Sequence, residues 1–148
     1  PIQNGEEDET FAIVKNSFHE FVENDLTEEG TIAFFRAARE MIYEKPKNHF
    51  LFIAVSDSRI VGMIDIREDG HICLFFVDRN HHRSGIGRKL LETAQVQLNS
   101  KKHVGNELDV NSSLFAVEAY ESLGFIKTKE VQMVNGIKFV PMLKRPVG

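Results

Sequence analysis

Residues 71–91 have the sequence HICLFFVDRNHHRSGIGRKLL, and this stretch decides the fold. Residues 71–77 are mostly aliphatic or aromatic, which predicts a strand covered on both faces. Residues 78–84 are polar and have no strand pattern. Residues 85–99 carry apolar side chains at helical spacing, which predicts an amphipathic helix. The stretch is therefore a buried strand, a polar turn and a helix.

The polar turn has the features of an anion site. Gly85 and Gly87 lie where the helix begins, and without a Cβ their backbone can closely approach a ligand. The first N–H groups of a helix are free and carry the positive end of its dipole. Arg83, Arg88 and Lys89 add positive charge, so the natural ligand is a pyrophosphate. Neither a Walker A loop nor a dinucleotide fingerprint matches, and a plain strand-to-helix turn is the alternative interpretation.

The hydrophobic periodicity of the whole chain predicts an alternation of helices and strands. The predicted helices and strands are helices over residues 9–23, 28–44, 85–99 and 114–123, and strands over residues 50–55, 60–66, 71–77, 108–110, 126–134 and 137–143. Asn135-Gly136 predicts a tight hairpin between the last two strands, and Gly124 the end of the fourth helix. This order indicates one α/β domain over residues 1–148 with a mixed sheet.

Composition narrows the class of protein. Of the 148 residues, 42% are hydrophobic and 27% are charged, with a net charge of −4. The negative net charge argues against a nucleic-acid partner, because nucleic-acid-binding proteins need a basic surface. No apolar run is long enough to cross a membrane. Cys73 is the one cysteine, so an internal disulfide is excluded. We therefore expect a cytoplasmic protein with neither nucleic acid nor membrane as a partner.

Two motifs give the chain a family resemblance. Residues 74–78 followed by 84–91 resemble motif A of the GNAT superfamily, whose pattern is Gln/Arg-x-x-Gly-x-Gly/Ala. Residues 108–125, ending Tyr-Glu-Ser-Leu-Gly-Phe, resemble motif B, which ends Tyr-Glu-x-x-Gly-Phe. The order of strands and helices also agrees over nearly the whole chain. The chain departs from the pattern at His82, which replaces Gln/Arg, and at Ser113, where Asn is common.

The resemblance implies a fold and an activity. The implied fold is a mixed, mostly antiparallel sheet flanked by helices, in which a bulged strand and its parallel neighbour splay apart to hold the coenzyme. The implied activity is transfer of an acetyl group from acetyl-CoA to a primary amine by direct attack in a ternary complex. The amine would belong to a small molecule or a peptide, and a homodimer is left open.

The resemblance also implies which residues bind the coenzyme. The main chain of residues 75–77 would bind the pantetheine arm and acetyl carbonyl, and the turn over residues 82–88 would bind the pyrophosphate. The implied cofactor-binding residues are Phe75, Phe76, Val77, His82, Arg83, Ser84, Gly85, Ile86, Gly87, Arg88, Asn111 and Ser113.

Tyr120 and His71 are the candidate catalytic residues. Tyr120 matches the family tyrosine that faces the coenzyme sulfur, where a phenol can donate a proton to the thiolate. His71 lies eleven residues before His82, where many relatives place a glutamate base. An imidazole suits a base that takes a proton from an amine. Strand alternation predicts that His71 shares a face with Cys73, Phe75 and Val77.

Several alternatives stay open. Asp65, Glu107 or bulk water are the other candidate bases, and a one-residue slip of the strand would favour Asp65. A non-catalytic CoA-binding module and an enzyme using a longer acyl donor are the competing functions.

Two other site chemistries are disfavoured. Cys73 lies in an apolar strand, where a thiol is usually inert. His71, Asp78, His81 and His82 lack the spacing of metal ligands, so no metal is expected.

Overall fold

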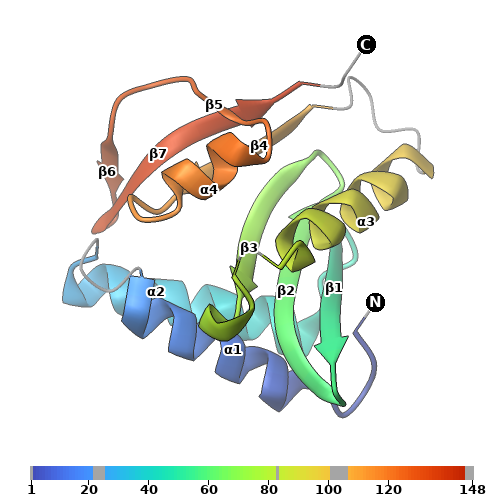
Figure 1. The fold of residues 1–148 in the computed structure, drawn as a ribbon. Helices are drawn as coiled ribbons and strands as arrows, with labels where there is room; N and C mark the ends of the chain where they lie inside the picture. Colours follow the sequence, from blue (N-terminus) through green and yellow to red (C-terminus); the bar gives the residue numbers. More distant parts are fainter. Residues whose placement is uncertain (1, 22–25, 83, 101–106, 146–148) are drawn as a thin grey trace.

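The computed structural model describes residues 2–21, 26–82, 84–100 and 107–145, and its helices and strands follow the predicted order (Figure 1). In chain order they are α1 (Glu7–Phe21), α2 (Glu28–Arg39), a π-helical segment (Glu40–Glu44), β1 (His49–Ser56), β2 (Arg59–Arg67), β3 (His71–Val77), a 3-10 turn (Arg79–His81), α3 (Ile86–Ser100), β4 (Leu108–Ser112), α4 (Val117–Ser122), β5 (Ile126–Lys127), β6 (Gln132–Val134) and β7 (Ile137–Lys144). None of the helices in these ranges is both long and apolar enough to span a membrane.

The strands form a mixed sheet in the order β1-β2-β3-β4-β7-β5, and β6 pairs with the start of β7. Every pairing is antiparallel except that of β3 with β4. The predicted fold class, a mostly antiparallel sheet with one parallel pair and flanking helices, is confirmed.

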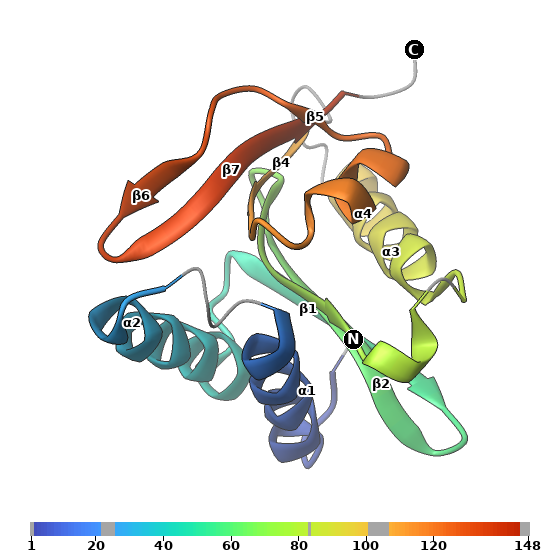
Figure 2. The same cartoon turned by 60° about the vertical axis from the view of Figure 1, so that its left-hand side comes forward.

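Helices cover both faces of the β1–β3 half of the sheet, as the continuous apolar strands predicted (Figures 1 and 2). On one face, α3 buries Leu90 and Leu91 against Ile64 and Ile66 of β2. The other face has a second core, between the N-terminal helices and the sheet. Its fully buried members are Val14, Ala38, Ile42, Leu51, Met63 and Leu74.

The predicted turns form where the local chemistry favours them. Asn135 and Gly136 both have positive φ, 52° and 80°, as a two-residue hairpin turn requires. Gly124 ends α4 at φ +100°, and the next N–H, that of Phe125, donates to the Tyr120 carbonyl over 3.0 Å. Lys45 also adopts the left-handed conformation and ends the second helical segment before Pro46.

The predicted strand over residues 126–134 is divided in two. Lys127 pairs with Met142, whereas Gln132 pairs with Phe139, so four residues of one chain segment oppose two of β7. One of those two is Pro141, which has no N–H to donate to a ladder. The excess residues therefore leave the sheet between β5 and β6.

The β6–β7 turn lies against the beginning of α2 (Figure 2). The Thr27 N–H donates to the Gly136 carbonyl over 2.8 Å, and the Thr27 hydroxyl accepts from the Gly30 N–H to cap the helix. A Cβ at Gly30 would overlap the Gly136 carbonyl. This close approach joins the beginning of α2 to the hairpin between β6 and β7.

Candidate functional site

The parallel strands β3 and β4 are paired only at their beginnings. His71 pairs with Asp109 and Ile72 with Val110, and the Asp109 N–H donates to the Gly70 carbonyl over 3.0 Å. On its other edge β4 pairs with β7 along its whole length, so residues 111 and 112 have a strand partner only on that side. Within the described chain, residues 74–77 of β3 therefore have a strand partner only on the β2 side. This is the predicted splayed pair.

The antiparallel register shows which backbone groups face the open edge of β3. The Asp78 N–H donates to the Val61 carbonyl over 2.7 Å, so Asp78 and Val61 form a hydrogen-bonded pair. In an antiparallel ladder every second pair of residues is hydrogen-bonded in this way. In this register Phe76 exchanges its hydrogen bonds with Met63 of β2. The N–H and C=O groups of Phe75 and Val77 point the other way. The main chain of Phe76 is thus not part of the open edge, in contrast to the sequence-based expectation.

A β-bulge at Cys73 corrects the predicted arrangement of side chains on β3. Ile66 pairs with Ile72 but Asp65 pairs with Leu74, which leaves Cys73 as the extra residue. The bulge reverses the alternation: Ile72 and Phe75 both pack in the α3-side core, whereas Leu74 packs in the other core. His71 therefore does not share a face with Phe75 and Val77. Simple alternation failed because one residue was inserted between them.

The polar turn after β3 is held by its own side chains. The His82 ring nitrogen Nε2 donates to the Val77 carbonyl over 2.8 Å, which supports the turn at the Gln/Arg position of the motif. The Ser84 hydroxyl donates to the His81 carbonyl. Gly85 has φ +86° and precedes the first turn of α3, whose Lys89 N–H donates to the Gly85 carbonyl. Arg83 lies outside the described residues.

The first turn of α3 presents backbone donors beside the open strand edge. Ile86, Gly87 and Arg88 precede the first intrahelical hydrogen bond from Lys89, so their N–H groups are not used within the helix. Gly87 lies against Phe75: a Cβ there would be 3.7 Å from the Phe75 Cζ, an ordinary contact. The Arg88 guanidinium donates to the Ser122 carbonyl of α4 over 3.2 Å.

Tyr120 of α4 also lies against β3, through a contact with Phe75. Its ring meets that of Phe75 edge to face, with centroids 6.0 Å apart, and that of Phe125 at 5.2 Å. The Tyr120 side chain is buried. Burial raises the pKa of the Tyr120 phenol, so the hydroxyl keeps its proton well above neutral pH.

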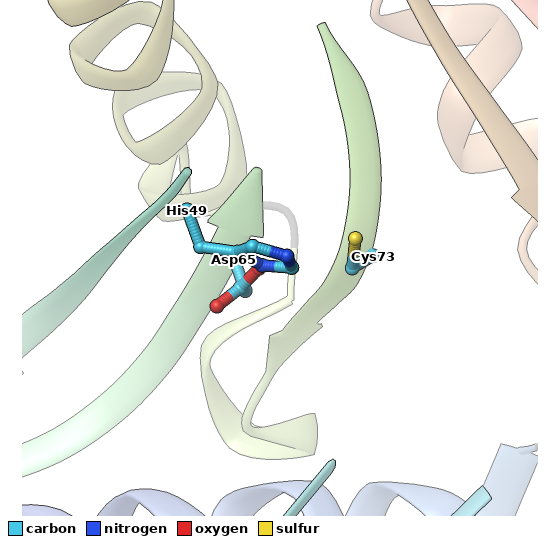
Figure 3. A group of neighbouring side chains, drawn as sticks. All are labelled: His49, Asp65 and Cys73. Carbon is cyan, nitrogen blue, oxygen red and sulfur yellow. The ribbon is translucent and has the colours of Figure 1, made fainter. Parts of the chain in front are cut away.

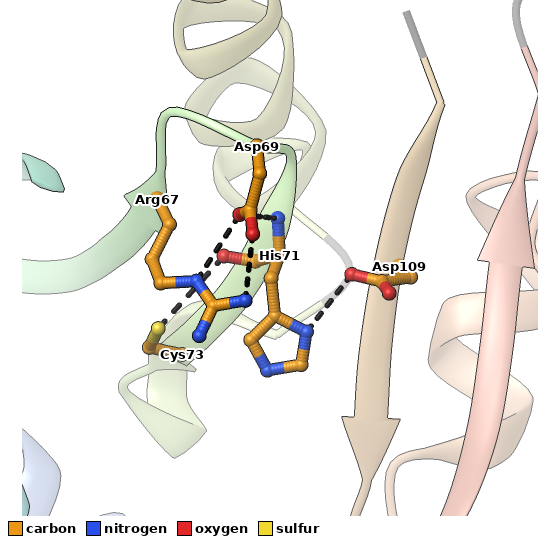
Figure 4. A network of polar contacts seen from close by, with 5 residues as sticks. All are labelled: Arg67, Asp69, His71, Cys73 and Asp109. Atoms are coloured by element: carbon orange, nitrogen blue, oxygen red, sulfur yellow. Dashed lines mark hydrogen bonds and ion pairs between the residues drawn. The ribbon is translucent and has the colours of Figure 1, made fainter. Parts of the chain in front are cut away.

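His71 lies where β3 and β4 begin to separate, and its ring is held by a carboxylate (Figure 4). Nδ1 lies 2.8 Å from Oδ1 of Asp109, the residue opposite on β4. The preceding turn is fixed by Arg67, which donates twice to Asp69, at 3.1 and 2.7 Å. Asp69 in turn accepts from the His71 N–H over 3.2 Å. Asp109 thus pairs with the candidate base, and it did not emerge from the sequence because the pairing depends on strand register.

Comparison with known proteins agrees with this geometry. The family model described as an acetyltransferase (GNAT) domain matches residues 21–146. The chain belongs to the GNAT acetyltransferase family. No curated protein matches the sequence.

Solved GNAT structures share the fold over nearly the whole chain. A GCN5-related N-acetyltransferase from Rhodopseudomonas palustris is 19% identical, with 99% of this chain and 93% of that one covered and a TM-score of 0.80. The PaiA N-acetyltransferase of Thermoplasma acidophilum, in complex with coenzyme A, is 15% identical, with 98% and 96% covered and a TM-score of 0.73. An aminoglycoside 6'-N-acetyltransferase complexed with coenzyme A is 14% identical, with 97% and 92% covered and a TM-score of 0.70.

The remaining predicted coenzyme residues of this GNAT domain, Asn111 and Ser113, lie on β4 and directly after it. Asn111 is exposed on β4 and pairs in the ladder with Pro141 of β7. The Ser113 hydroxyl accepts from the Ala116 N–H over 3.2 Å and so supports the beginning of α4. The Ser113 side chain therefore has a structural role at the beginning of α4.

The other candidate bases of this GNAT domain are less suitably placed than His71. Asp65 is fully buried, and its carboxylate contacts His49 at 2.6 Å. Burial raises the pKa of Asp65, and the hydrogen bond from His49 opposes that shift. Glu107 is about half exposed and lies 4.0 Å from Arg145. Burial raises the pKa of the Cys73 thiol to about 12, which agrees with an inert cysteine.

Proposed function

We propose that the protein transfers an acetyl group from acetyl-CoA to a primary amine, with both substrates bound at once. The observation that carries the proposal is the unpaired edge of β3 leading directly into the free N–H groups at the start of α3. A pantetheine arm has amide groups that match a free strand edge. A pyrophosphate matches a helix N-terminus after a glycine turn.

The backbone would orient and polarise the thioester. Phe75 offers its N–H and C=O groups on the open edge of β3, and Val77 offers its N–H, because the Val77 carbonyl accepts from His82. An N–H donor directed at the acetyl oxygen stabilises the charge that develops there when the amine attacks. The bulge at Cys73 determines which residues of β3 direct their N–H and C=O groups to the open edge, because it shifts the pairing with β2 by one residue.

His71 would act as the base in this scheme. Its Nδ1 donates to Asp109, which leaves Nε2 to accept a proton, directly or through water. The amine nitrogen forms a bond to the acetyl carbon, the carbon–sulfur bond breaks, and the proton lost by nitrogen passes to His71. Asp109 would hold the ring orientation and stabilise the imidazolium that forms.

Tyr120 would stabilise the departing thiolate. Its raised pKa keeps the phenol protonated over the whole physiological range, so the hydroxyl remains a donor for sulfur. Solvent would return any proton that the phenol gives up. The contact between the Tyr120 and Phe75 rings supports this role, since it brings α4 against the strand that would carry the thioester.

The test is release of free CoA thiol from acetyl-CoA in the presence of polyamines, amino acids, aminoglycosides and peptide N-termini. Mass spectrometry then identifies the acetylated amine. We expect turnover with at least one amine class. The variants Tyr120→Phe and His71→Ala, which each remove a proposed catalytic group, should lower it. Tight acetyl-CoA binding without turnover on any amine would instead favour a non-catalytic CoA-binding module of the same fold.

A further inference from the structure

A second cluster of polar side chains lies on β1, β2 and β3, apart from the proposed coenzyme edge (Figure 3). His49, Asp65 and Cys73 each contribute one donor atom, and these nitrogen, oxygen and sulfur atoms all lie within 4.8 Å of one another. The Cys73 thiol also donates weakly to the His71 carbonyl over 3.8 Å. His49 Nδ1 is 2.6 Å from Asp65 Oδ1. The bulge explains the third member, because it places Cys73 as an extra residue beside Asp65 on the neighbouring strand.

Asp65 shows that the hydrogen-bonding capacity of the cluster is not satisfied. The residue has no exposed surface, yet its Oδ2 has no hydrogen-bond partner within the described chain. An unpartnered carboxylate oxygen in the interior of a protein costs free energy, because it has lost its hydrogen bonds to water. The nearby arginine does not relieve it: Arg67 is engaged in two hydrogen bonds to Asp69.

A cavity borders two members of the cluster, His49 and Asp65, but not Cys73. It has a volume of about 270 Å³ and is lined by His49 and Asp65 together with Ile2, Lys45, Phe50 and Gln97. Lys45, the cation in the lining, is bound to Glu7 at 2.6 Å. The space is large enough for an ion and for water molecules.

We propose that His49, Asp65 and Cys73 bind a divalent transition-metal ion, with Zn²⁺ as the natural occupant. The three donors are an imidazole nitrogen, a carboxylate oxygen and a thiolate, which is a set that Zn²⁺ favours and that Mg²⁺ and Ca²⁺ do not. Two ligands of a tetrahedral zinc ion lie roughly 3.5 Å apart, given bond lengths of about 2.0–2.3 Å. Side-chain shifts of about an ångström therefore complete the three-ligand set, and water from the cavity fills the fourth position.

Binding would release the Cys73 thiol proton to solvent and give the orphaned Asp65 carboxylate a partner. The ion would link three adjacent strands at the bulge, so it would stabilise the folded protein. This proposal does not depend on acetyl transfer, because it assigns no role to the residues proposed to bind the coenzyme or to transfer protons.

The test is titration of the untagged, metal-free protein with Co²⁺, followed by displacement with Zn²⁺. We expect one equivalent of Co²⁺ to give a sulfur-to-cobalt charge-transfer band, which only Cys73 can supply because it is the one cysteine. Cys73→Ser should abolish the band, and His49→Gln and Asp65→Asn should each weaken Zn²⁺ binding at least tenfold. His19→Gln, which removes an exposed imidazole on α1, is the matched control and should leave the affinity unchanged.

A second measurement on the wild-type protein guards against variants that fold poorly. X-ray absorption of the Zn²⁺-loaded protein should show one sulfur among nitrogen and oxygen neighbours. Absence of the cobalt charge-transfer band, Zn²⁺ affinity that survives in Cys73→Ser, or a zinc shell without sulfur would each overturn the proposal.

Discussion

His71 and Asp109 face each other across the short parallel pairing of β3 and β4, with Nδ1 and Oδ1 2.8 Å apart. The pair lies at the closed end of the splayed strands, where β3 turns into the unpaired edge. A histidine held in this way has one ring nitrogen fixed and the other directed elsewhere, which is the arrangement that a general base requires.

The roles of this pair can be separated by substitution. His71→Ala should lower kcat by about 10²-fold or more, in the range for a lost general base, and Asp109→Asn by about tenfold, because it weakens the orientation of the ring. His71→Glu should restore part of the rate, since a carboxylate can also accept a proton. Steady-state kinetics with the identified amine provide the measurement.

Glu107→Gln is the matched control for this series, because Glu107 is exposed and contacts only Arg145 among the ion pairs described. Its kcat should stay at the wild-type value. A wild-type rate in His71→Ala, together with a collapse of the rate in Asp65→Asn, would transfer the role of base to Asp65.

Tyr120→Phe should lower kcat on the order of 10- to 1000-fold while acetyl-CoA affinity is nearly unchanged. The substitution keeps the ring that packs on Phe75 and Phe125, so folding should be preserved. Because burial raises the pKa of Tyr120, the wild-type enzyme should show no loss of rate from phenol ionisation up to pH 10, the ordinary pKa of tyrosine. Single-turnover kinetics and calorimetry measure the two quantities. An unchanged kcat in the variant would show that Tyr120 only packs against its neighbours and takes no part in catalysis.

Asp65→Asn should stabilise the metal-free protein at neutral pH. Burial raises the folded-state pKa of Asp65 above its ordinary value of 3.8, so the penalty on folding grows as the pH rises from 3.8 to the folded-state pKa and stays constant above it. Below pH 3.8 the carboxyl is protonated in both states and the penalty disappears. We expect a Tm increase of about 4 °C at pH 7.5, equivalent to roughly 1 kcal/mol, that shrinks towards pH 4. Thermal denaturation across this range measures it, and a Tm decrease at pH 7.5 would show that the His49 contact outweighs the burial cost.

Local sequence signals predicted those parts of the structure that depend on near neighbours. The strand 71–77 has the predicted bounds, and the turns at Gly124 and Asn135-Gly136 formed as expected, because apolar runs and positive-φ residues act within a few positions. The bulge at Cys73 is different: it arises from the match between two strands and leaves no mark in the order of apolar residues.

In the candidate site too, residues in contiguous motifs could be predicted, whereas contacts between distant strands could not. The glycine turn and Tyr120 come from contiguous motifs and could be identified from the sequence. Asp109, and the meeting of His49 with Asp65 and Cys73, depend on which residues face each other across strands distant in the chain. Such contacts require the register, which a single sequence does not specify.

The central claim is that the turn at the start of α3, together with the open edge of β3, holds the coenzyme. Gly87→Val tests it most directly, because a Cβ at Gly87 makes only ordinary contacts with Phe75 and Val77, so the fold should tolerate the change. Its branched side chain would occupy the space that the pyrophosphate must approach. Isothermal titration calorimetry of acetyl-CoA should show single-site binding to the wild-type protein and no measurable binding to a folded Gly87→Val variant. Equal affinity in the two proteins would contradict the account and place the coenzyme elsewhere.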